Sequence, residues 1–146
     1  MPIFKKIMVA YDGSPHSKKA LTKAAELMNR DSDVEMHIVS VTPPPSMDLY
    51  SMYGLGLSQK VMDEYNELAQ KTMTEAEEFM AEHKDSCQFV RLQGNASQTI
   101  IEYADKQKFD LIILGSRGLG AFKGMLLGSV SHHVVTHADS HVLVIK

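Results

Sequence analysis

The chain has 146 residues, enough for a buried core, and its length predicts a single domain over residues 1–146. Its hydrophobic fraction of 44% and charged fraction of 23% are those of an ordinary water-soluble globular protein. A net charge of −3, without a basic stripe, argues against nucleic acid as a partner. The apolar runs are far shorter than the ~20 residues of a membrane-spanning helix, so we expect no membrane partner.

The amino-terminal region and the cysteine content both favour a cytoplasmic protein. Lys5 and Lys6 precede only a short apolar run, and Asp12 ends that run before a secretory signal could form. Cys87 is the single cysteine, which excludes an internal disulfide framework and favours a reducing compartment. We expect Cys87 to be a buried, unreactive thiol.

Short apolar runs alternate along the chain with longer segments of helical periodicity. The first run ends at the turn Tyr11-Asp12-Gly13, after which Ser14 is a predicted helix N-cap and Pro15 opens the helix. The predicted strands span residues 3–10, 34–41, 87–92, 109–114 and 141–145. The helices between them are predicted after Ser14, from Lys60 to about His83, after Gly94-Asn95-Ala96-Ser97, and from Ser129 to about Thr136.

Five strands alternating with four helices predict a five-stranded, parallel, doubly wound α/β sheet with helices on both faces. Such a sheet binds its ligand outside the carboxyl ends of the strands, near the point where the strand order reverses. Function is therefore expected close to Asp12, Val41, Gly94 and Gly115, which follow or end the predicted strands.

A glycine-spaced segment follows the fourth predicted strand. Gly115-Ser116-Arg117-Gly118 comes directly after it, and Gly128-Ser129-Val130-Ser131 opens the last predicted helix. Glycine lets a ligand approach the backbone, and the N–H groups of a helix N-terminus favour phosphate. The serine hydroxyls could donate to phosphate oxygens and Arg117 could screen their charge, although Ser129 could also simply cap the helix. The segment matches neither the Walker A pattern nor the dinucleotide fingerprint.

The full spacing, Gly-x2-Gly-x9-Gly-Ser, resembles the ATP-binding branch of the universal stress protein family. The resemblance extends over the whole chain, through the runs KKIMVAYDGSPHSKKAL, FDLIILGSRG and GSVSHHVVTHADSHVLVI. It implies a Rossmann-like fold of the adenine nucleotide α-hydrolase type and a stress-response role. Tyr11 departs from the family pattern, in which a small residue often precedes the aspartate, and Arg117 stands where histidine is also common.

The resemblance also implies a role for individual residues in binding ATP. Asp12 would contact the ribose, Ala10, Val41 and Leu114 would flank the adenine, and Gly115 would lie by the ribose. The residues that would surround the phosphates are Arg117, Gly118, Gly128, Ser129, Val130 and Ser131. Mg²⁺ or Mn²⁺ would accompany ATP through phosphate oxygens and water. Family members dimerise through the last strand, so a homodimer through residues 141–145 is implied.

Three classes of function remain open for such a site. The protein could be a nucleotide-dependent regulatory switch, a slow ATPase, or an interaction scaffold that holds AMP or another nucleotide structurally. Hydrolysis needs a positioned water and usually a base, and the segment contains neither Glu nor His. We therefore expect no catalytic residue and, at most, slow ATP turnover.

Two further features have competing interpretations. The loop from Thr42 to about Ser58, rich in Met and Tyr, could pack locally or act as an adaptable lid or partner surface. His133 and His137 stand at i and i+4, a spacing that can bind zinc, but the intervening positions hold no glutamate. We expect solvated or interface histidines there and no metal site.

Overall fold

The computed structural model describes residues 3–44, 59–118 and 126–146. Its strands all run parallel in one five-stranded sheet of order β3-β2-β1-β4-β5. Their bounds are β1 (Lys6–Ala10), β2 (Glu35–Thr42), β3 (Cys87–Gln93), β4 (Leu111–Gly115) and β5 (His141–Ile145). The predicted five-stranded parallel α/β fold is therefore confirmed.

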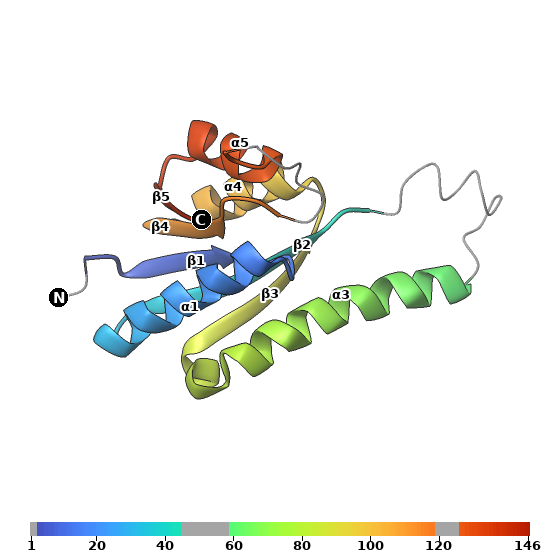
Figure 1. Ribbon diagram of the computed structural model, residues 1–146, viewed down its shortest axis with the longest axis horizontal. Coiled ribbons are helices and arrows are strands. Elements are labelled where there is room, and N and C mark those ends of the chain that lie inside the picture. The colour runs from blue at the N-terminus through green and yellow to red at the C-terminus, as the bar shows by residue number, and fades with distance from the viewer. Residues whose placement is uncertain (1–2, 45–58, 119–125) are drawn as a thin grey trace.

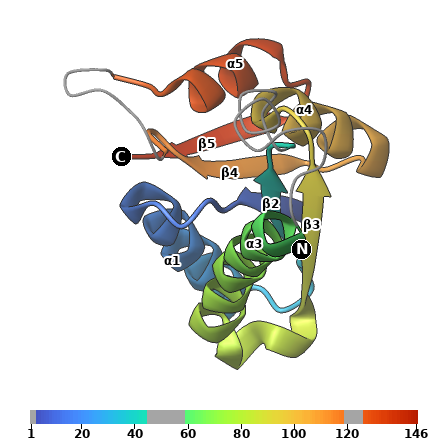
Figure 2. The ribbon, with the colours of Figure 1, turned by 90° about the vertical axis from the view of Figure 1, so that its right-hand side faces the viewer.

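Helices cover both faces of this sheet (Figure 1). They are α1 (Pro15–Arg30), α3 (Gln59–Phe79), α4 (Ala96–Gln107) and α5 (Ser129–His137), with a 3-10 helix η1 (Ala81–Ser86). Figure 2 shows α1 and α3 on one side of the sheet and α4 and α5 on the other. Each side has its own apolar core, because successive strand residues point to opposite faces: Ile7 and Val9 pack toward α1 and α3, Met8 toward α4 and α5.

Two helices begin with a side-chain cap and one does not. The Ser14 hydroxyl oxygen accepts from the Ser17 N–H at 3.2 Å, and Asn95 Oδ1 accepts from the Gln98 N–H at 3.1 Å. The N-cap of α5 is Gly128, which makes no side-chain cap hydrogen bond. Ser129 is thus the first helical residue and not the cap, which corrects the capping interpretation of that serine.

Element boundaries differ from the predictions at several places. The start of the first strand differs most among the strand boundaries, because β1 starts at Lys6 and not at residue 3. The predicted helix to about His83 ends at Phe79, because the chain tightens into η1 before β3. The fourth strand starts at Leu111, two residues later than predicted. Just before it, Asp110 Oδ2 accepts from the backbone N–H groups of Lys5 and Lys6, at 2.8 and 2.9 Å, and ties the strand entry to β1. β2 ends at Thr42; most of the predicted loop, residues 45–58, lies outside the described residues.

The strand order reverses at β1. From β1 the chain builds outward through β2 and β3 to one edge of the sheet, then returns to place β4 and β5 on the other side. The carboxyl ends of β1 and β4 therefore border the crevice where a doubly wound sheet binds its ligand. Among the described helices, none is long and apolar enough to cross a membrane.

Candidate functional site

A cavity of about 200 Å³ lies at the carboxyl ends of β1, β2 and β4, against the first turns of α4 and α5. Every residue predicted for the site lines it: Ala10, Asp12, Val41, Leu114, Gly115, Arg117, Gly118, Gly128, Ser129, Val130 and Ser131. Strand ends far apart in the sequence are thus brought to one place, while the binding role of these residues stays a prediction.

The same cavity is lined by residues that the sequence analysis missed: Tyr11, Ser14, Ser17, Val39, Ala96 and Ile100. Two periodicities could have found three of them. Val39 precedes Val41 by two residues and so shares its face of the strand, while Ala96 and Ile100 stand at i and i+4 on one helix face. The apolar face that α4 contributes to the cavity wall could therefore have been predicted from the sequence.

One end of the cavity is an apolar slot between β2 and α4. Val39 and Val41 form its sheet side, and Ala96 and Ile100 form its helix side. Val39 and Ile100 are buried in the core shared with α4 and α5, and Val41 packs against that core. We call these four residues the β2–α4 slot. Its walls suit a flat, weakly polar group.

Asp12 stands at the polar side of the cavity, within a turn. Its Oδ1 accepts from the Ser14 N–H at 2.9 Å, and Gly13 has a φ of 85°, which favours glycine. Asp12 therefore stabilises the turn and also lines the cavity. A Cβ on Gly118 would lie 2.5 Å from Asp12 Oδ2, so a larger residue there would force the Asp12 carboxylate to move.

Gly115 is required for packing between secondary-structure elements. A Cβ there would lie 2.6 Å from His16 Cβ and 2.9 Å from the Ser17 backbone nitrogen. The missing side chain makes room for the first turn of α1, which is a different reason from the close ligand approach suggested by the sequence. Gly115 still lines the cavity with its backbone.

The first turn of α5 is held against the end of β4 by internal hydrogen bonds. The Gly128 N–H donates to the Ser116 carbonyl at 2.7 Å. The Ser131 hydroxyl is directed to the carbonyl oxygens of Ser116 at 2.7 Å and Gly128 at 3.1 Å. A hydroxyl has one hydrogen, so Ser131 is buried structural support and offers no donor to the cavity. This corrects the expected donor role of Ser131; Ser129 remains exposed.

Arg117 brings a cation to the same end of the cavity. Its Nε is buried and makes no hydrogen bond within the described part of the chain. A buried guanidinium N–H without an acceptor is costly, by about 1–3 kcal/mol. An acceptor at this position, anionic or neutral, would remove that cost.

The histidines of α5 do not form a metal centre with other described residues. The rings of His133 and His137 stack at 4.2 Å between centroids, and His137 Nδ1 lies 3.1 Å from the His133 carbonyl oxygen. No group of three or more His, Cys, Asp or Glu is placed to hold a metal ion in residues 3–44, 59–118 and 126–146. Cys87 is half-buried and not fully buried as expected; its thiol packs against Met28, and partial burial raises the pKa of that thiol to about 11, which keeps it protonated.

The fold and the cavity define a class: a doubly wound α/β domain with a ligand crevice where its strand order reverses. The model of the universal stress protein family matches residues 3–146, so the chain belongs to that family. A curated relative, the universal stress protein YxiE of Bacillus subtilis, is 30% identical over 149 residues, covering 99% of this chain and 100% of the relative.

Solved structures agree with this fold. The universal stress protein UspA from Lactobacillus plantarum superposes with a TM-score of 0.79 at 24% identity, over 97% of each chain. A universal stress protein in complex with cAMP superposes with a TM-score of 0.71 at 25% identity, over 98% of this chain and 97% of that one.

Proposed function

We propose that the cavity binds an adenine nucleotide, with ATP as the ligand, and that the protein is a cytoplasmic, homodimeric, nucleotide-dependent switch in a stress response. The observation that carries the proposal is the lining of the cavity: apolar residues of β2 and α4 come from one side of β1, and Arg117 and the first turn of α5 follow β4 on the other side. The β2–α4 slot suits an adenine ring, and the end formed by Arg117 and the first turn of α5 suits phosphates. Asp12, between them, is placed for the ribose hydroxyls.

The phosphate end is supported by the contrast among the helix N-termini. α1 and α4 have side-chain caps, whereas α5 begins at Gly128 without one. Its first N–H groups and the positive end of its dipole therefore suit an anionic ligand. Arg117 Nε, buried and without an acceptor in the described residues, adds a second, independent donor. A triphosphate would use both.

The nucleotide class is also supported by a relative with the same fold. The structure at a TM-score of 0.71 is of a universal stress protein that holds cAMP, which shares the adenosine of ATP. AMP and cyclic nucleotides would fill the β2–α4 slot equally well, and ATP is favoured here by the donors at the phosphate end. Mg²⁺ or Mn²⁺ would join through phosphate oxygens and water.

The site fits holding ATP better than hydrolysing it. Asp12 is the single carboxylate among the described residues that line the cavity, and its Oδ1 already accepts from the Ser14 N–H. A hydrolytic water would need another base or orienting group. A slow ATPase is therefore the weaker alternative. If the protein were an interaction scaffold, the bound nucleotide would not change its oligomeric state. In a switch, the nucleotide would change that state.

The ligand can be identified directly. Freshly purified protein is denatured, and the released nucleotide is identified by mass and then titrated back calorimetrically. We expect ATP or AMP to be released and to rebind. The proposal is overturned if no adenine nucleotide is released and neither ATP nor adenosine binds in the titration.

Val41→Asp tests the adenine wall. A carboxylate in the β2–α4 slot would be desolvated by the bound base, so affinities for ATP, AMP and adenosine should all fall by about tenfold or more. Val41 is half-buried at the strand end, which leaves the core largely intact. Calorimetric titration of the three ligands measures this, and a loss confined to ATP would place Val41 at the phosphates instead.

The proposed dimer uses β5, which is an edge strand of the sheet. Leu143 on β5 is 37% exposed and Val135 on α5 is 45% exposed, so apolar surface accompanies the free edge. We expect a dimer in sedimentation velocity, and Leu143→Lys should shift it toward monomer without changing the far-ultraviolet spectrum. A wild-type monomer at tens of micromolar would rule out this interface.

A further inference from the structure

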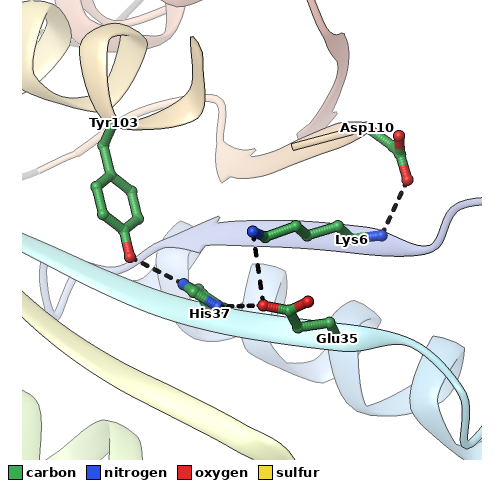
Figure 3. Close-up of polar contacts among 5 residues, drawn as sticks. All are labelled: Lys6, Glu35, His37, Tyr103 and Asp110. Carbon is green, nitrogen blue, oxygen red and sulfur yellow. Dashed lines mark hydrogen bonds and ion pairs between the residues drawn. The ribbon is translucent and has the colours of Figure 1, made fainter. Parts of the chain in front are cut away.

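A buried histidine lies beneath the β2–α4 slot. His37 is 3% exposed and shares its face of β2 with Val39 and Val41, because alternate strand residues point the same way. Tyr103 shares its face of α4 with Ile100, one turn earlier. Strand and helix thus present two facing columns of side chains. Val39, Val41 and Ile100 line the cavity. At the other end of the two columns, His37 and Tyr103 meet in a hydrogen bond (Figure 3).

The hydrogen bonds of His37 have a defined direction. Nδ1 lies 2.9 Å from the Tyr103 hydroxyl, and Nε2 lies 2.9 Å from Glu35 Oε1. A carboxylate only accepts, so Nε2 carries the hydrogen. In the neutral imidazole, Nδ1 is then an acceptor, and the Tyr103 hydroxyl must donate to it.

Neighbouring groups keep both partners of His37 in the required form. The hydrogen bond from His37 lowers the pKa of Glu35, and the Lys6 ammonium 3.6 Å away acts in the same direction. Burial raises the pKa of Tyr103, and the charge of Glu35 adds to this, so the phenol keeps its hydrogen. The Phe109 ring packs edge-on against the imidazole at 4.9 Å between centroids. Lys6 is itself held in place on β1, where its N–H donates to Asp110 Oδ2.

We propose that the His37–Tyr103 hydrogen bond sets the separation between β2 and α4, and so positions the β2–α4 slot for the adenine ring. The inference rests on the nucleotide-binding function proposed above. Apolar contacts between helix and sheet are non-directional and tolerate small shifts. A hydrogen bond holds its two heavy atoms within a few tenths of an ångström, and this part-buried one fixes α4 at a point one turn from Ile100. Tyr103 and His37 are thus positioning residues that do not touch the ligand.

Tyr103→Phe removes the hydroxyl and keeps the ring that packs near Phe109. We expect affinities for adenosine, AMP and ATP to fall by the same factor, about fivefold for one lost hydrogen bond. Because the slot would fit the base less closely, the preference for ATP over GTP should narrow by a similar factor. Calorimetric titrations measure both, and thermal unfolding checks that the fold is retained.

Two substitutions of His37 provide matched controls. The side-chain oxygen of Asn is two bonds from Cβ, like Nδ1, so His37→Asn still offers an acceptor to Tyr103. The amide nitrogen of Gln is three bonds from Cβ, like Nε2, so His37→Gln can still donate to Glu35 but has no acceptor at the position of Nδ1, two bonds from Cβ. We expect His37→Asn to keep adenosine affinity within about twofold, and His37→Gln to lose as much as Tyr103→Phe. The double variant of Tyr103→Phe and His37→Gln should lose no more than either alone.

The outcomes separate the two proposals. If wild-type protein binds neither adenosine nor ATP, the nucleotide-binding function itself fails. If wild type binds and Tyr103→Phe keeps both its adenosine affinity and its preference for ATP over GTP, the positioning role is refuted while the site stands. Equal losses of adenosine affinity in His37→Asn and His37→Gln would also refute the positioning role. The affinity would then depend on the imidazole ring itself and not on its hydrogen bond to Tyr103.

Discussion

Gly128→Glu is expected to abolish ATP binding while the fold is retained. Gly128 is buried at the N-terminus of α5, and a Cβ there would meet Arg117 Cα at 3.5 Å and the Gly118 backbone nitrogen at 3.6 Å, which is ordinary contact. The added carboxylate, however, would compete with a phosphate for the helix N-terminus and for Arg117. Like charges brought together cost several kcal/mol, so ATP affinity should fall by about a hundredfold or more.

The matched control is Gly128→Ala, whose methyl group fits the measured space and carries no charge. It should keep ATP affinity within a few-fold. Adenosine, which has no phosphate, should bind Gly128→Glu far better than ATP does. Calorimetric titration of ATP and adenosine against both variants tests this directly. If Gly128→Glu bound ATP as tightly as wild type, the phosphates could not lie at this end of the cavity.

Gly115→Ala is expected to destabilise the fold itself. Its Cβ would lie 2.6 Å from His16 Cβ and 2.7 Å from the His16 carbonyl carbon, so the first turn of α1 would have to move away from β4. The carbonyl carbon is a backbone atom and Cβ is fixed directly to the backbone, so neither can rotate aside. Overpacking of this kind costs about 1–3 kcal/mol.

Urea unfolding of Gly115→Ala measures this loss of stability. Gly128→Ala is again the comparison, with an expected loss below about 1 kcal/mol from a poorer N-cap. Nucleotide affinity of the folded fraction of Gly115→Ala serves as a second readout. A variant as stable as wild type would show that α1 adjusts at no cost, and the glycine would then be explained by ligand approach alone.

Local sequence signals predicted most elements because their causes are local. Ser14 and Pro15 start α1 where expected, since a cap acts on N–H groups only a few residues away. β5 has the predicted bounds, while β4 starts later than predicted, just after Asp110, which accepts from the backbone of Lys5 and Lys6, more than one hundred residues earlier. A contact across that separation leaves no local pattern.

The candidate site likewise combines residues that local sequence signals predicted with residues that they did not. The strand ends, the glycine spacing and the family resemblance together predicted a set of residues that all line one cavity. The α4 wall was not predicted, although Ala96 and Ile100 have helical spacing, because that spacing does not show which helix face borders a strand end. The hydroxyl of Ser131 could not be assigned from sequence, because its acceptor, the Ser116 carbonyl, is on another element.

By itself, therefore, the sequence determined the parallel α/β fold and the strand ends at which a ligand would lie. Periodicity, caps and turn residues act over a few positions and can be read one segment at a time. The packing of Gly115 against α1 and the pairing of His37 with Tyr103, 66 positions away, became visible in the folded chain alone. Both depend on how closely a helix packs against the sheet, a distance set by many side chains together and encoded in no single segment.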